Sequence, residues 1–136
     1  MDKKIVVPAD MDHLDEVMDS LHNILEEGDF DENFTMKVEL AVEEMYTNIA
    51  SYAYKGEKGE AEVDCILTDA PKQITIVFTD GGLPYNPLER DDPDVTLKAE
   101  DRQIGGLGIF LTKKFMDDVA YEYKDGKNIL SISKKC

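Results

Sequence analysis

Three short groups of residues in this chain combine side chains and spacings that could do chemistry. A carboxylate and an amide, Glu44 and Asn48, stand four residues apart in a stretch with helical periodicity, so both lie on the same side of one helix. An acidic residue, Asp80, ends an alternating apolar stretch and is followed by two glycines. The third group is the run Gly105-Gly106-Leu107-Gly108, which opens another helical pattern.

The glycine run is the most distinctive of these groups. Three glycines in four residues let the backbone turn sharply and approach a ligand with no Cβ in the way. The unpaired N–H groups at the start of the following helix attract anions, and the helix dipole adds to that attraction. The run therefore predicts a phosphate-binding loop. The alternative is a loop that only lets a helix pack closely on a sheet, and the run alone does not separate the two.

The carboxylate and the amide lie at the border of a helix's apolar face. The helix is expected over residues 34–54, with a core face made of Val38, Ala41, Val42, Met45, Ile49 and Tyr52. From that border, Glu44 and Asn48 can point into a cleft. The competing interpretation is an exposed polar pair on the helix surface.

The rest of the chain predicts the elements that position these groups. Strands are expected over residues 3–7, 61–68, 73–79, 119–124 and 128–133, and helices over 11–27, 34–54 and from the glycine run to about 118. Asp10 is expected to cap the first helix and Gly28 to end it, while Asp31 or Asn33 caps the second. This order predicts an α/β (α+β) two-layer sandwich: a mixed, largely antiparallel sheet of about five strands with three helices on one face.

Residues 83–104 show no clear periodicity and contain three prolines. An irregular stretch of this length inside a compact domain is commonly a lid or a binding loop. A surface insertion without order is the alternative.

Length and composition set the remaining bounds. A chain of 136 residues is expected to form one domain, 1–136. The net charge of −15 argues against nucleic acid or an anionic membrane as a partner. Neither an apolar run of about 20 residues nor a signal peptide is found, so a cytoplasmic protein is expected. Cys65 and Cys136 are interpreted as plain thiols. The acidic side of the first helix is either a solvated face or a partner surface.

Taken in chain order, the three groups resemble the motifs of a known family. Glu44-x-x-x-Asn48, Asp80-x-Gly82 and Gly106-x-Gly108 are similar to those of the GHKL ATP-binding fold, also called the Bergerat fold. The resemblance covers nearly the whole chain and is closest to the stand-alone anti-sigma factor serine/threonine kinases of bacterial partner-switching systems. Residues 41–48 and 106–109 carry most of it.

The resemblance implies how a nucleotide would be bound. Asn48 would hold Mg²⁺ through its amide oxygen, since this hard cation prefers oxygen ligands. Asp80 would accept a hydrogen bond from the adenine amino group of ATP or ADP, and Gly82 would let the backbone approach the base. The phosphates would be bound by the loop of Gly105, Gly106, Leu107 and Gly108. Residues 83–104 would be the ATP lid.

The resemblance also implies an activity. Glu44 would orient or deprotonate an attacking hydroxyl, whereas histidine kinases carry Asn or His at this position. The family resembled here phosphorylates a small antagonist protein on serine or threonine and sequesters a sigma factor or another regulator, and a homodimer is implied as well. A nucleotide-dependent module that sequesters a regulator without catalysis is the alternative, and a domain that binds no nucleotide is a third interpretation.

Some positions depart from the family pattern or stay open. Pro84 stands where a second glycine is usual, as in the variant that the partner-switching kinases carry. No basic residue is assigned to the phosphates by a motif; the candidates, each also readable as a surface charge, are Arg90, Lys98, Arg102 and Lys113. Ser131 either approaches the base or only packs.

Overall fold

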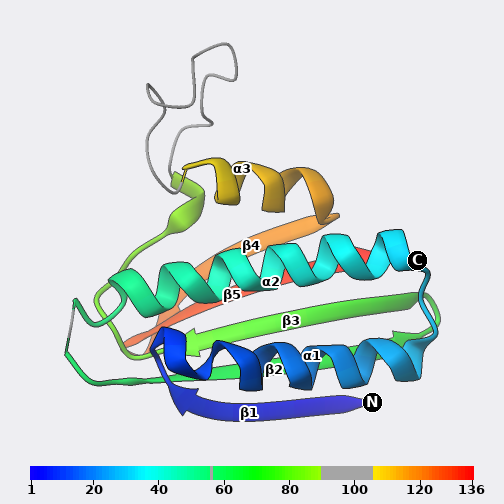
Figure 1. The fold of residues 1–136 in the computed structure, drawn as a ribbon. Helices are drawn as coiled ribbons and strands as arrows, with labels where there is room; N and C mark the ends of the chain where they lie inside the picture. Colours follow the sequence, from blue (N-terminus) through cyan, green and yellow to red (C-terminus); the bar gives the residue numbers. More distant parts are fainter. Residues whose placement is uncertain (56, 90–105) are drawn as a thin grey trace.

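The computed structural model describes residues 1–55, 57–89 and 106–136. Its elements are β1 (Asp2–Pro8), η1 (Met11–His13), α1 (Leu14–Gly28), α2 (Glu32–Tyr52), β2 (Glu60–Asp69), β3 (Lys72–Asp80), η2 (Pro87–Glu89), α3 (Gly106–Phe115), β4 (Asp118–Lys124) and β5 (Lys127–Lys135). Figure 1 shows a single sheet with α1 and α2 lying across one face and α3 next to α2. The predicted two-layer α+β sandwich is confirmed.

Within the described residues the sheet has five strands in the order β1-β2-β3-β5-β4, and each neighbouring pair is antiparallel. The sheet is therefore not mixed, as the sequence predicts, but antiparallel, because hairpins and long connections join its strands in antiparallel pairs throughout. Consecutive strands β4 and β5 are joined by the tight turn at Asp125 and Gly126, whose φ angles of 54° and 78° are those of a two-residue hairpin turn. The last strand then lies in the middle of the sheet beside β3. This arrangement places Asn128 directly opposite Asp80, at one end of the sheet.

The core lies between the sheet and the helices. Every second residue of β2, β3 and β5 is buried, as period-two alternation requires for a half-covered sheet. The α2 core face is correct except at Tyr52, which is 41% exposed because the helix ends there. Tyr46 is fully buried instead, and its hydroxyl donates to the carbonyl oxygens of Pro8 and Asp10.

Gly28 ends the first long helix as predicted, whereas the third helix ends earlier than predicted. Gly28 is the last residue of α1, and Asp29 takes the left-handed conformation that follows it, with φ of 52°. Gly28 is small for another reason: a Cβ there would lie 2.3 Å from a ring carbon of Phe30. The third helix ends at Phe115 rather than near residue 118, because β4 already begins at Asp118.

The predicted caps are present. Asp10 accepts a hydrogen bond from the His13 N–H, although the turn it caps is the short η1 that precedes α1. Of the two candidates for α2, Asp31 is the cap, and it accepts from the Phe34 N–H at 2.7 Å. These bonds satisfy N–H groups that a helix start leaves without intrahelical partners.

Within the described ranges, no helix is both long and apolar enough to cross a membrane. Cys65 is buried and Cys136 exposed, and both are free thiols, as predicted. Burial raises the pKa of the Cys65 thiol to about 12, which keeps it protonated and unreactive.

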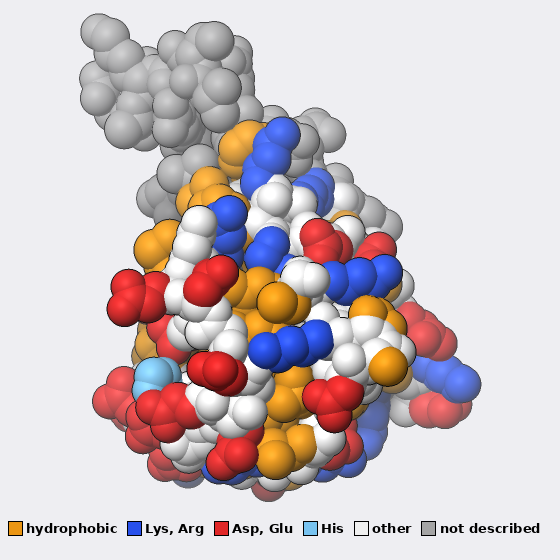
Figure 2. Space-filling model, turned by 90° about the vertical axis from the view of Figure 1, so that its right-hand side faces the viewer, with side chains coloured by type: hydrophobic (Ala, Val, Ile, Leu, Met, Phe, Trp, Pro, Cys, Tyr) orange, Lys and Arg blue, Asp and Glu red, His pale blue; other side chains and the backbone are white. Residues whose placement is uncertain are grey.

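Figure 2 shows the molecule from the end of the sheet where β3 begins, which is the right-hand end in Figure 1.

Candidate functional site

The side chain of Asn48 is hydrogen-bonded to the backbone of Glu44 within α2. The Asn48 side-chain N–H donates to the carbonyl oxygen of Glu44 at 2.8 Å, and Asn48 is only 9% exposed. This bond fixes the amide and leaves its oxygen, the atom predicted to bind a metal, outside that interaction. The interpretation of the pair as two exposed polar side chains does not hold for Asn48.

The Glu44 carboxylate lies against the first turn of α3. A Cβ built on Gly108 would stand 2.0 Å from Glu44 Oε2 and 2.6 Å from its Cδ, so the glycine is what allows this close approach. Burial, and to a lesser extent the charge of Glu43, raises the pKa of the Glu44 carboxyl. A carboxylate that is costly to ionise is a stronger proton acceptor once ionised.

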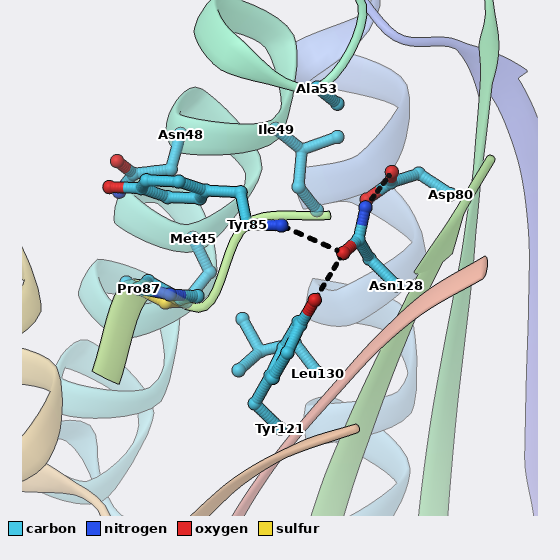
Figure 3. Close-up of a pocket in the computed structure, with 10 residues that line it drawn as sticks. All are labelled: Met45, Asn48, Ile49, Ala53, Asp80, Tyr85, Pro87, Tyr121, Asn128 and Leu130. Carbon is cyan, nitrogen blue, oxygen red and sulfur yellow. Dashed lines mark hydrogen bonds between the residues drawn. The ribbon is translucent and has the colours of Figure 1, made fainter. Parts of the chain in front are cut away.

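Asp80 ends β3 inside a pocket that also contains Asn48 (Figure 3). The pocket is lined by Met45, Asn48, Ile49, Ala53, Asp80, Tyr85, Pro87, Tyr121, Asn128 and Leu130. Asp80 is 6% exposed, and its Oδ1 accepts from the Gly82 N–H and from the Asn128 side chain, both at 2.9 Å. Apolar side chains with one oriented carboxylate are typical of sites that bind a flat, polar-edged ring.

Asn128 is a residue of this pocket that the sequence analysis missed. Its side-chain N–H₂ donates to Asp80 Oδ1 and to the Leu83 carbonyl oxygen, each at 2.9 Å. Its amide oxygen accepts from the Tyr85 N–H at 3.1 Å and from the Tyr121 hydroxyl. Asn128 therefore orients Asp80 and ties the end of β3 to the segment that follows it, as the dashed lines of Figure 3 show in part.

The sequence held one usable signal for Asn128. It lies two residues before Leu130 in an alternating strand, so it faces the helix layer; Ser131 has the opposite parity and is not among the pocket's lining residues. What the sequence could not indicate is that β5 pairs with β3, which alone brings Asn128 to Asp80. Ser131 therefore lies on the sheet face away from this pocket. Of its two interpretations, packing fits this position and approach to the base does not.

Gly82 is placed against the end of α2. A Cβ there would lie 2.2 Å from the Ala53 carbonyl oxygen, an atom that also accepts from the Leu83 N–H. Close packing on a helix end is thus a sufficient reason for this glycine, and its predicted approach to a base stays a prediction. Next along the chain, the buried hydroxyl of Tyr85 has no hydrogen-bond partner among the described residues.

The remaining predicted residues are placed only in part. Gly106 and Leu107 form the start of α3 with Gly108. Gly105 and three of the basic candidates, Arg90, Lys98 and Arg102, lie outside the described residues, as does the predicted lid beyond residue 89. Lys113 lies in the last turn of α3, far from the helix start where a phosphate would be bound.

The residues present fit a magnesium ion shared with a ligand, and they do not fit a site made of protein ligands alone. The described part of the chain holds no cluster of three His, Cys, Asp or Glu side chains able to bind a metal. Mg²⁺ commonly takes one or two protein oxygens and completes its shell with water and phosphate oxygens. The fixed amide of Asn48 offers one such oxygen. The first N–H groups of a helix have no intrahelical partner, so the start of α3 suits the phosphates.

Comparison with known proteins identifies relatives of this arrangement. The family model for a histidine kinase-like ATPase domain matches residues 7–134. The serine-protein kinase RsbW of Listeria monocytogenes is 31% identical over 116 residues, covering 82% of this chain and 73% of the relative. The anti-sigma F factor of Clostridium acetobutylicum is 26% identical over 98 residues, covering 72% of this chain and 67% of that protein.

One further sequence relative and one solved structure agree with these matches. The serine/threonine-protein kinase BtrW of Bordetella bronchiseptica is 28% identical over 94 residues, which are 69% of this chain and 66% of that one. The crystal structure of the RsbU and RsbW domains of Rv1364c from Mycobacterium tuberculosis superposes with a TM-score of 0.70 at 14% identity. It covers 98% of this chain, which spans only 32% of that larger protein, and at this identity it supports the fold alone.

Proposed function

The chain belongs to the family of histidine kinase-like ATPase domains, and we propose that residues 1–136 form a single Mg-ATP-dependent serine/threonine protein kinase domain that also sequesters a regulator. Family membership confirms the resemblance inferred from the three motifs. The single observation that carries the proposed kinase chemistry is the contact between the Glu44 carboxylate and Gly108 at the start of α3. It puts a proton acceptor next to the backbone that would bind the phosphates.

The nucleotide would occupy the pocket between α2 and the end of β3. Asp80, oriented by Asn128, would accept a hydrogen bond from the adenine amino group. The apolar pocket residues would cover the faces of the ring. Asn48 would bind Mg²⁺ through its amide oxygen, and the N–H groups from Gly105 to Gly108 would bind the phosphates.

The chain's own contribution to phosphoryl transfer would be positioning and one proton acceptor. Bound Mg-ATP supplies the γ-phosphoryl group and neutralises part of its charge. Glu44 would hold the hydroxyl of a serine or threonine in line and accept its proton as the oxygen bonds to phosphorus and ADP departs. Burial of Glu44 supports this role, because it raises the proton affinity of the carboxylate.

The proposed partners are proteins. The names of two relatives, a serine-protein kinase and an anti-sigma F factor, support a small antagonist protein as the phosphorylation substrate and a sigma factor or another regulator as the sequestered partner. Phosphorylation of the antagonist would break its complex with this chain and free the chain to bind the regulator. Self-association into a homodimer belongs to the same proposal.

The proposal is tested by measuring nucleotide binding and phosphoryl transfer on the same variants. Calorimetry with Mg-ATP should show binding by wild type and Glu44→Gln, and loss of the Mg²⁺-dependent part of the affinity in Asn48→Ala. Transfer from γ-labelled ATP to a candidate antagonist should occur with wild type only. If wild type binds Mg-ATP but transfers no label, the chain is a sequestering module without catalysis. If wild type does not bind Mg-ATP at millimolar concentration, the proposed nucleotide site is rejected.

A further inference from the structure

Lysine and phenylalanine side chains lie in a row along one surface at the end of the molecule where β3 begins. We call this surface the Lys–Phe strip; in spatial order it comprises Lys72, Phe30, Phe34, Lys134, Phe115 and Lys37. The residues come from the α1–α2 connection and from α2, β3, α3 and β5. Figure 2 looks at this end and shows Lys side chains beside hydrophobic ones through the middle of the face, with acidic side chains mainly around them.

The contacts of the strip are continuous. The Lys72 ammonium lies 4.6 Å from the centre of the Phe30 ring, which is stacked on Phe34 with 4.3 Å between ring centres. The Lys134 ammonium lies 5.7 Å from the centre of the Phe34 ring. These are distances at which a cation is attracted by the face of an aromatic ring.

The strip continues onto α3. Lys134 donates to the Phe115 carbonyl oxygen at 2.6 Å, and the Lys37 ammonium lies 5.8 Å from the centre of the Phe115 ring. Apart from Phe34, which is 8% exposed, the members of the strip are half-buried. The strip therefore presents ammonium groups and ring surface to the outside together.

The three lysines of the strip keep unneutralised charges in a strongly acidic chain. Within the described ranges, none of the three ammonium groups has a carboxylate oxygen within 4 Å. This includes the carboxylate of Asp69, the residue opposite Lys72 in the sheet. The chain has 30 acidic residues against 15 basic ones, so unpaired lysines are not explained by a shortage of carboxylates. A positive surface on a protein of net charge −15 is a local feature that favours an acidic partner.

A purely structural role accounts for only part of the strip. Lys134 binds the last carbonyl of α3, and Lys72 binds the Asp29 carbonyl oxygen at 3.3 Å, so both close helix ends. Among the described residues, Lys37 makes neither kind of bond, and its ammonium lies over the Phe115 ring. The half-buried Lys37 cation and the half-buried rings of Phe30 and Phe115 are therefore not explained by these helix-end bonds.

The strip is separate from the proposed nucleotide site. Strand β3 runs from Lys72 in the strip to Asp80 in the pocket, roughly 26 Å at ~3.3 Å per residue. The distance is shorter on the helices: α3 runs from Gly106 to Phe115, roughly 13 Å, and on α2 Lys37 lies about two turns, roughly 10 Å, from Glu44. No residue of the strip takes part in the proposed binding of ATP or in the proposed proton transfer.

We propose that the Lys–Phe strip docks an acidic segment of a protein partner. Carboxylates of that segment would pair with the ammonium groups of Lys37 and Lys72, and an aliphatic or aromatic side chain between them would cover the rings of Phe30 and Phe115. The choice of a protein rests on the proposed function, in which both partners are proteins. Mixed ring and ammonium surface also suits a peptide, whereas the overall charge of the chain opposes binding of long polyanions.

The test is a peptide selection on the full chain without nucleotide, so that its result does not depend on kinase activity. A random library of 12-residue peptides is selected on wild type and counter-selected on Lys37→Gln/Lys72→Gln. Selected peptides are then titrated by fluorescence anisotropy against wild type, that double variant, and the control Lys58→Gln/Lys124→Gln, which removes the same charge from exposed sites elsewhere. Thermal melts establish that all three proteins are folded.

The proposal predicts selected peptides that combine several Asp or Glu with a large apolar residue. Their affinity should fall about tenfold or more in Lys37→Gln/Lys72→Gln and less than about twofold in the control, since the direct pairs are lost only in the former. Several results would overturn it: no selected peptide, peptides without an acidic excess, or equal losses in both double variants. Tighter binding of a single-stranded 20-mer DNA or of phosphatidylglycerol vesicles than of the peptides, with the same dependence on Lys37 and Lys72, would also reject a protein partner. So would a wild-type dimer in sedimentation that Lys37→Gln/Lys72→Gln dissociates, because a second copy would then occupy the strip.

Discussion

Gly108 on α3 and Glu44 on α2 approach so closely that any β-carbon on Gly108 would stand 2.0 Å from the Glu44 carboxylate oxygen. The contact joins two of the three sequence groups that were separated by some 60 residues of chain. It means that the start of α3 cannot shift without affecting the proposed proton acceptor. The glycine therefore leaves room for the neighbouring carboxylate, in addition to its proposed role in binding phosphates.

A substitution of Gly108 should act on Glu44 more than on stability. In Gly108→Ala the new methyl group collides with the far end of a flexible side chain, so the carboxylate moves and the fold is kept. We expect phosphoryl transfer to fall about tenfold or more, since misplacement by about 1 Å is costly to catalysis, with a thermal midpoint close to wild type. Gly81→Ala is the matched control, because a Cβ there has only the Tyr54 hydroxyl nearby, at 3.7 Å. Equal transfer rates in the two variants would contradict the assigned contact.

Neutralising Glu44 should stabilise the protein while abolishing transfer. Because burial raises the pKa of this carboxyl above its usual 4.5, the folded state holds the proton more tightly than the unfolded chain. Its stability then falls as the pH rises from the unfolded to the folded pKa and stays lower above. Glu44→Gln should therefore melt higher than wild type at pH 7.5, with the difference disappearing toward pH 4, while transfer drops about 100-fold or more. A lower melting temperature at pH 7.5 would argue that Glu44 is a structural residue.

Asn128 should matter for nucleotide affinity and for stability together. Asn128→Ala removes one of the two donors to Asp80 Oδ1 and takes away the Asn128 partner of the Leu83 carbonyl and of the Tyr85 N–H. Each buried polar group left without a partner costs about 1–3 kcal/mol. We expect a lower melting temperature and an ATP affinity weakened about tenfold or more by calorimetry. Ser131→Ala, in the same strand but on the other face of the sheet, should change neither. Normal ATP affinity in folded Asn128→Ala would show that Asp80 needs no such support.

A carboxyl group on the sheet face that the helices leave uncovered, that of Asp64, gives a second pH prediction. Burial raises the pKa of the Asp64 carboxyl to about 6, with the adjacent Asp2 adding to the shift, and Asp64 Oδ1 has no hydrogen-bond partner among the described residues. Stability should consequently fall as the pH rises from about 4 to about 6 and level off above that range. Asp64→Asn should raise the melting temperature at pH 7.5 and leave it unchanged near pH 4. If the melting temperature of the wild type fell no more over this pH range than that of Asp64→Asn, the raised pKa of Asp64 would be contradicted.

Much of the fold was readable because local patterns and packing agree in this chain. Alternation in residues 61–68 and 73–79 reflects a sheet covered on one face, and Asp31 and the Asp125-Gly126 turn act as local signals suggest. Gly28 ends α1 as predicted, but its close packing on the Phe30 ring is a tertiary contact that the sequence does not display. Tyr52 was predicted to be in the core but is exposed, because periodicity does not show at which residue a helix extends beyond the core.

The candidate site was predictable to the extent that single elements carry it. Glu44 and Asn48 belong to one helix, so their spacing already places them together. Asn128 and Asp80 come from strands whose pairing depends on the whole sheet order, so no local pattern could join them. The Lys–Phe strip is a more extreme case, since its members come from five segments that meet only in the folded chain.

The most direct measurement is transfer of label from γ-labelled ATP to a panel of small candidate antagonist proteins, followed by acid treatment and analysis of the labelled amino acid. Wild type with Mg²⁺ should give acid-stable label on serine or threonine, and Glu44→Gln, with ATP affinity unchanged by calorimetry, should give about 100-fold less. Acid-labile label on histidine, or no label from wild-type protein that binds Mg-ATP, would contradict a hydroxyl-directed kinase.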